Sequence, residues 1–149
     1  MRRHPALRSL SSEHHTGLVI AHRARQAVRE NGDGRSAAWY EVRERFRTEL
    51  EGHFRREERG LLPMLRALGE TGLVERSLQE HQTLRALVAE DRVENLEPFA
   101  DLLASHIRFE EQTLFDTAQR LLGPSMLKAL EDVSGEVPPA AGAAKRSGG

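Results

Sequence analysis

The sequence contains no cysteine. This absence excludes disulfides, thiolate zinc sites, cysteine-ligated iron–sulfur clusters and a thiol nucleophile. Any metal ion would have to be held by His, Asp and Glu side chains, of which the chain has 7 histidines and 23 acidic residues.

Long apolar runs are missing too. No stretch approaches the roughly 20 apolar residues of a membrane span, and the basic residues 1–10 are not followed by the apolar run of a signal peptide. The net charge is only −1, so nothing calls for nucleic acid or an acidic membrane surface as a partner. We expect a soluble, cytoplasmic protein whose oligomeric state the sequence leaves open.

Strand patterns are also absent, since period-two alternation is missing and β-branched residues are few. The sequence therefore predicts an all-α protein, and its 149 residues suggest one domain with room for a real core. Within the second helix Gly60 and Pro63 predict a break or kink, and Gly69 predicts its latest end. The expected helices span about residues 12–30, 37–59 with a possible extension to 68, 73–90, 96–123 and 124–133.

Four long helices with short links predict an up-down-up-down four-helix bundle. Ser11 or Ser12 is expected to cap the first helix, and Asn95 the fourth. The bundle, with its short C-terminal helix, is predicted to occupy residues 1–134. Residues 135–149 are rich in Gly, Ala and Pro, which predicts a disordered tail.

One short motif occurs twice. His53-Phe-Arg-Arg-Glu57 in the second helix recurs as His106-Ile-Arg-Phe-Glu110 in the fourth. Residues four apart share a helix face, about 6 Å apart along the axis. Each copy thus offers a nitrogen ligand and a carboxylate from one side of one helix. Two such helices, facing each other, can hold a pair of metal ions with each carboxylate bridging them.

The first and third helices echo each other in the same way. Glu13-His14-His15-Thr16 matches Glu80-His81-Gln82-Thr83. The echo pairs His14, not His15, with His81, and helical periodicity also places His15 off the apolar face. Each of the four helices therefore carries one histidine on its apolar face. The candidate metal ligands are His14, His53, Glu57, His81, His106 and Glu110.

Each candidate also has a simpler interpretation. A lone histidine on an apolar face is usually a hydrogen-bonded core residue, and His–x3–Glu spacings arise often on Glu-rich helices. Glu58 and Glu111 are interpreted as solvated neighbours of the ligands. The joint pattern favours a metal centre, because ionised groups are costly to bury unless they are paired or bind a cation. Histidine and carboxylate suit iron, manganese or zinc.

Taken together, these motifs resemble the hemerythrin-like, or HHE cation-binding, domains from roughly Leu7 to Gly123. The resemblance implies a four-helix bundle with a non-haem di-iron centre whose two irons share an oxo or hydroxo bridge. Carried over by position, the four histidines would be terminal ligands, and Glu57 and Glu110 the bridging carboxylates. Iron is accordingly favoured over manganese or zinc.

The sequence departs from the oxygen-carrying members in the third helix. There they have a second histidine four residues after the first, whereas this chain has Arg85. Either the metals keep open or water-filled positions, or His15 or Glu58 completes the ligand set. Arg85 could instead hold a bound anion or peroxide. The Glu-x-x-His motif of ferritin-like di-iron proteins is not found on the apolar faces, which disfavours that class.

Four functions are compatible with these residues. The first is a di-iron protein that binds or senses dioxygen or related small oxidants. The second is an enzyme that decomposes peroxide at the same centre, and the third is iron storage or delivery. The fourth is a metal-free interaction bundle. Dioxygen or peroxide is the small ligand expected from the first two.

Overall fold

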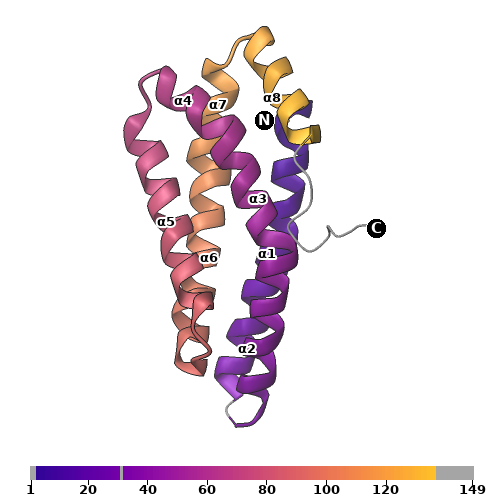
Figure 1. Cartoon of the computed structure of the whole chain (residues 1–149), viewed down its shortest axis with the longest axis vertical. Helices are drawn as coiled ribbons and strands as arrows, with labels where there is room; N and C mark the ends of the chain where they lie inside the picture. Colours follow the sequence, from indigo (N-terminus) through magenta and orange to yellow (C-terminus); the bar gives the residue numbers. More distant parts are fainter. Residues whose placement is uncertain (1–2, 31, 137–149) are drawn as a thin grey trace.

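The computed structural model describes residues 3–30 and 32–136. Within these residues every regular element is a helix and no strand is found, which confirms the predicted all-α class. Four long helical rods lie side by side, and a short fifth helix packs at one end of them (Figure 1). The alternating up-and-down order of the four rods stays a prediction. No helix in the described part is long and apolar enough to cross a bilayer.

The first rod starts earlier than the capping residues predicted. It is α1 (Pro5–Glu30), so Ser11 lies inside the helix, where its hydroxyl donates a hydrogen bond to Glu111 instead of capping. After the turn at Gly32, whose φ of 94° favours glycine, the second rod begins. Its segments are α2 (Gly34–Arg45), η1 (Phe46–Leu50), α3 (Glu51–Arg56), η2 (Glu57–Leu61) and α4 (Leu62–Ala67), of which η1 and η2 are π-helical turns.

The second rod does not break near Gly60 and Pro63 but continues to Ala67, which confirms the possible extension to residue 68. The π-helical turn η2 ends just before Pro63, which stands in the first turn of α4. Proline has no N–H to donate, and at Pro63 this missing hydrogen bond lies beside the π-helical turn, where the hydrogen-bonding pattern already changes. The helix is therefore not interrupted. Gly69, with a φ of 92°, follows the end of the rod as predicted.

The third and fourth rods follow the predicted ranges closely. Asn95 precedes the fourth rod but does not cap it. Its side-chain amide donates to the carbonyl of Leu87 and so ties the start of this rod to the end of the third. Of the predicted tail, residues 137–149 lie outside the described part of the chain. The segments are α5 (Thr71–Ala89), the 3₁₀ turn η3 (Val93–Asn95), α6 (Leu96–Phe109), the π-helical turn η4 (Glu110–Leu114), α7 (Phe115–Leu121) and α8 (Pro124–Glu136).

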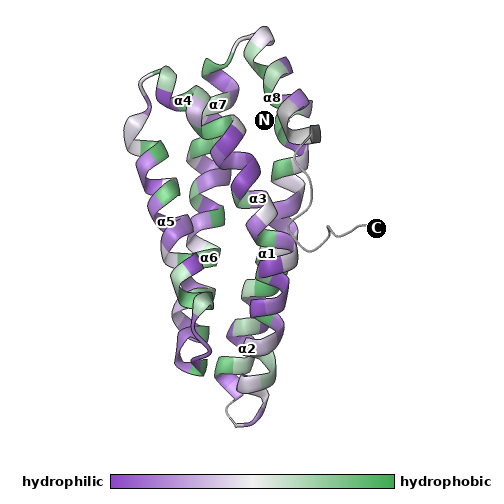
Figure 2. Ribbon diagram, viewed as in Figure 1, coloured by the Kyte–Doolittle hydropathy of each residue, from purple (hydrophilic) through white to green (hydrophobic). Residues whose placement is uncertain are grey.

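The apolar faces of the rods bury two separate clusters of side chains. One lies around Trp39 and Phe99, and the other around Leu65 and Phe115. Between them the second rod carries α3, which Figure 2 shows as mostly hydrophilic. The polar candidates of the sequence fall in this middle level. The bundle core is therefore two apolar layers with a polar layer between them.

Leu18, four residues after His14, is 40% exposed and so does not lie on the core face of α1. Gly17 is buried instead, because α1 passes so close to α6 that a Cβ on Gly17 would lie 2.7 Å from Cδ1 of Ile107. On α5 Leu84 is buried, whereas Arg85 is only half-buried, and Leu78 and Val88 pack half-buried against the two clusters.

Candidate metal centre

Six polar side chains meet in the middle layer, and all of them are 3% exposed or less. Each rod contributes a histidine from its core face, and the second and fourth rods also contribute a glutamate. These are the six residues that the sequence singled out as candidate ligands. His15, by contrast, is exposed and lies outside this layer.

The first half of this layer lies between α1 and the second rod, and we call it the His14–His53 half-site. Nε2 of His14 lies 2.9 Å from Oε1 of Glu110. Nε2 of His53 lies 2.9 Å from Oε2 of Glu57. Both imidazoles therefore turn the same nitrogen inward, toward an oxygen of each glutamate.

The second half, the His81–His106 half-site, repeats this arrangement between α5 and α6. Nε2 of His81 lies 3.0 Å from Oε1 of Glu57. Nε2 of His106 lies 3.2 Å from Oε2 of Glu110. Each glutamate thus presents one oxygen to each half-site, which is the placement that a bridging carboxylate requires.

The ligand atoms of each half-site converge on one point. In each group of four residues, one atom per residue lies within 4.8 Å of all the others, and Glu57 and Glu110 belong to both groups. Nε2 of His53, His81 and His106 and both oxygens of Glu57 are buried without a hydrogen-bond partner, although they lie near one another. Buried polar atoms that lie close together but are not aligned for hydrogen bonds lack partners, and a cation bound among them would supply one. The residues therefore fit a pair of metal ions.

Both candidate bridging residues begin a π-helical turn. Glu57 is the first residue of η2, and Glu110 the first of η4. Such one-turn π segments occur frequently at functional sites, because the extra residue changes which side chains face inward. The repeat of the His–x3–Glu motif is thus also a repeat of backbone conformation, which spacing alone did not predict.

The outward nitrogen of each imidazole is held by a further glutamate. Nδ1 lies 2.6 to 2.8 Å from a carboxylate oxygen in all four cases. Such a bond fixes the ring orientation and the tautomer that leaves Nε2 free for a metal. The interpretation of Glu58 and Glu111 as solvated neighbours is wrong, because both take part. The pairs are His14 with Glu111, His53 with Glu13, His81 with Glu58, and His106 with Glu80.

Arg85 does not point into the centre. Its guanidinium donates two hydrogen bonds to Glu58, at 2.9 and 3.2 Å, and a third to Glu51. The suggestion that Arg85 holds a bound anion or peroxide therefore gains no support from its contacts. Glu58 is likewise engaged, with His81 and Arg85.

Hydrogen bonds and nearby charges in the middle layer shift the pKa values of its side chains. Burial disfavours a cationic imidazole, but hydrogen bonds that the imidazoles donate to the glutamates outweigh it and raise the pKa of His14 and of His81 to about 11. Against the same burial, the charge of Glu110 raises the pKa of His106 to about 9. Burial and the charge of Glu110 oppose ionisation of Glu57, yet the neighbouring imidazoles lower its pKa to about 2. In the absence of metal these groups form ion pairs.

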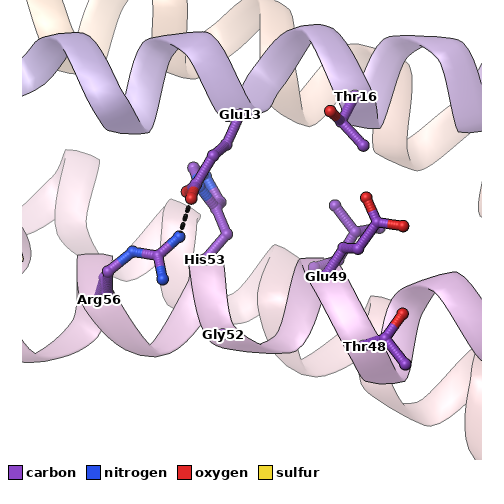
Figure 3. Close-up of a pocket in the computed structure, with 8 residues that line it drawn as sticks. Glu13, Thr16, Thr48, Glu49, Gly52, His53 and Arg56 are labelled. Carbon is purple, nitrogen blue, oxygen red and sulfur yellow. Dashed lines mark hydrogen bonds and ion pairs between the residues drawn. The ribbon is translucent and has the colours of Figure 1, made fainter. Parts of the chain in front are cut away.

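The His14–His53 half-site adjoins a pocket of about 240 Å³ between α1 and the second rod. Figure 3 shows Glu13 reaching down from α1 toward His53 and Arg56, with Thr16 and Glu49 further along the same opening. The pocket brings solvent to the outer edge of His53, while its inner nitrogen stays buried.

The comparison with known families agrees with this geometry. The family model of the hemerythrin HHE cation-binding domain matches residues 6–118, which include the whole polar layer. The chain belongs to this hemerythrin family. A metal-binding helical domain is thus shown. No curated protein and no solved structure matches the chain.

Proposed function

We propose that this hemerythrin-family chain is a non-haem di-iron protein that binds or senses dioxygen or related small oxidants in its middle layer. The observation that carries the proposal is that two buried groups of four ligand residues share Glu57 and Glu110. His14 and His53 would hold one ion, His81 and His106 the other, and the two glutamates would bridge them. Iron ions held there would supply the redox chemistry, with one electron available from each ion for an oxidant.

The charge of the layer supports a pair of divalent ions. The pKa of all four imidazoles is raised, so without metal the layer favours positive charge beside its two buried carboxylates. Divalent cations would supply that positive charge instead, and their binding would favour the neutral imidazole that can act as a ligand. Metal can therefore take the place of protons in this layer.

The protein would leave room for an oxidant. Each group provides two imidazoles and two shared carboxylates, and Arg85 does not add a further ligand. Iron sites with few histidine and carboxylate ligands keep open positions, which is where oxygen chemistry occurs. The same openness favours a second function, the decomposition of two peroxides to one dioxygen and two waters.

Optical spectroscopy of the iron-loaded protein tests the proposal. We expect reduced protein, loaded with iron without air, to gain a new visible or near-ultraviolet absorption when air is admitted. An unchanged spectrum in protein that retains its iron would contradict oxidant binding. Oxygen release from added peroxide separates the second function from the first, and the Glu57→Ala variant serves as the control without a bridged pair.

A further inference from the structure

Outside the four glutamates that hold the imidazoles lies a set of four arginines. Arg85 donates two hydrogen bonds to the carboxylate of Glu58, one from each terminal nitrogen, at 2.9 and 3.2 Å. Arg76 donates to Glu80 at 3.0 Å. The remaining pairs are Arg3 with Glu111 at 3.2 Å, and Arg56 with Glu13.

Each arginine therefore completes a chain of three side chains, which we call a relay. The four relays are Arg3–Glu111–His14, Arg56–Glu13–His53, Arg85–Glu58–His81 and Arg76–Glu80–His106. Every histidine of the centre has one, and each glutamate comes from a rod other than that of its histidine. A carboxylate held from outside by a guanidinium has less freedom to rotate, so its bond to Nδ1 is better defined.

Two relays are braced by an aromatic ring as well. Phe54 stacks on the ring of His81, with centroids 3.9 Å apart, and the guanidinium of Arg85 lies over its ring at 5.7 Å. Phe115 stacks on His14 in the same way, and Arg3 lies over it at 5.6 Å. These histidines lack a glutamate four residues later on their own helix, so the ring and the relay orient them.

We propose that Arg3, Arg56, Arg76 and Arg85 are positioning residues of the metal centre, which act through the four glutamates to keep each Nε2 aimed inward. The inference rests on the proposed function, because it assumes that the middle layer binds metal. It assigns a role to four arginines whose contacts with glutamate resemble ordinary surface ion pairs. Such pairs also occur here without a histidine, as between Arg66 and Glu75.

The direction in which an arginine substitution changes metal affinity distinguishes a positioning role from a purely electrostatic one. Removing a positive charge near a cation site should tighten metal binding if the arginine acts only through its charge. If the arginine positions the glutamate, its removal should loosen metal binding in spite of that charge effect. We expect Arg85→Gln to weaken Fe²⁺ binding about tenfold, at the low end of the range found for outer partners of metal ligands.

The experiment is a competition between the full chain and a chelator for Fe²⁺ in the absence of air. The matched control is Arg66→Gln, which removes the same charge from a pair that touches no histidine. Arg85→Lys keeps the charge but loses the two-nitrogen grip, so it should recover only part of the affinity. Thermal melts of the metal-free variants measure any general loss of stability separately.

A double-mutant cycle shows whether Arg85 acts through Glu58. In a Glu58→Gln background, Arg85→Gln should have no further effect on affinity, whereas in a Glu80→Gln background, which breaks a different relay, it should keep its full effect. Binding by Arg85→Gln that equals or exceeds that of wild type would overturn the proposal, as would an effect that persists without Glu58. Wild type that takes up no Fe²⁺ would overturn the proposed function as well, so the two failures differ.

Discussion

The His14–His53 and His81–His106 half-sites use the same parts but differ in their surroundings. The glutamates behind His14 and His53 are 30% and 39% exposed, whereas those behind His81 and His106 are 23% and 17% exposed. A pocket reaches His53 itself, whereas the pocket that Glu58 lines does not include His81. The first half-site is therefore closer to solvent. We expect small oxidants and exchanging metal ions to reach the centre from that side.

A second difference between the half-sites lies at positions where the sequence echo fails. Four residues before His81 stands Ser77, whose hydroxyl donates to Oε2 of Glu110 at 2.8 Å, whereas the matching position before His14 is Leu10. Three residues after His81 stands Leu84, whereas Gly17 follows His14. A repeated ligand motif thus specifies equal ligands, and its unmatched neighbours make the two environments unequal.

The largest expected effect comes from the residues that the half-sites share. Glu57→Ala or Glu110→Ala should lose most of the bound metal from both half-sites, because each removes an oxygen from each ion. Glu58→Ala should weaken only the His81–His106 half-site, by about 10- to 100-fold, and should still load in excess metal. Metal analysis after gel filtration measures this. Equal metal in Glu57→Ala and Glu58→Ala would show that the bridging residue was wrongly assigned.

The next largest expected effect is a difference between the half-sites in their rates of metal release. We expect wild type to release its two ions to a chelator in two phases, the faster from the His14–His53 half-site beside the pocket. His53→Ala should remove the faster phase and His81→Ala the slower one. Stopped-flow absorbance of the chelator complex provides the rates. The proposed difference in access does not hold if release is a single phase, or if the two variants remove the opposite phases.

The melting temperature should shift by several degrees with pH. The pKa of His14 is raised from 6.5 to about 11 and that of His106 to about 9. Their protonation therefore stabilises the metal-free fold fully below pH 6.5 and loses this effect as pH rises through about 9 to 11. Bound metal contributes more as pH rises, because it no longer competes with protons.

The gap in melting temperature between loaded and metal-free protein should thus widen from about pH 6 to about pH 8.5. A change of about 1 kcal/mol moves a domain of this size by a few degrees, so thermal melts resolve it. The double variant of His53→Leu and His106→Leu is the control, in which chelator should have no effect. A gap that narrows with pH would contradict the assigned charges.

The smallest effect is expected at Ser77, the residue that distinguishes the second half-site. Ser77→Ala removes one hydrogen bond to the proposed ligand Glu110 without replacing any of the six ligands. Metal release from the His81–His106 half-site should become a few-fold faster, since about 1 kcal/mol is a typical net value of such a bond. The faster phase should stay the same. If it is the faster phase that changes, the two phases belong to the opposite half-sites.

Much of the fold and all six candidate ligands could be predicted from the sequence. The spacing of His53 with Glu57 and of His106 with Glu110 is a local property of one helix, so it can be read from the chain. The early start of α1 at Pro5 was missed, because Ser11 resembles a cap, although its hydroxyl contacts Glu111. That contact joins residues 100 positions apart.

The outer parts of the site were missed for the same reason. Glu58 and Glu111 follow the proposed bridging residues directly and look like solvated neighbours, yet they contact histidines on other rods. Arg85 was considered for the interior because it lies one turn after His81, but it faces Glu58. A signal was present: acidic residues stand beside four of the six ligands. Only the packing of the rods shows which histidine each one contacts.

The number of metal ions per chain tests the central claim most directly. Anaerobic titration of the metal-free protein with Fe²⁺, followed by chelator competition, should reach saturation at two ions per chain in wild type. The variant that combines Glu57→Ala with Glu110→Ala should bind far less. Saturation at a single ion, or equal binding by the double variant, would contradict a paired centre bridged by these two glutamates.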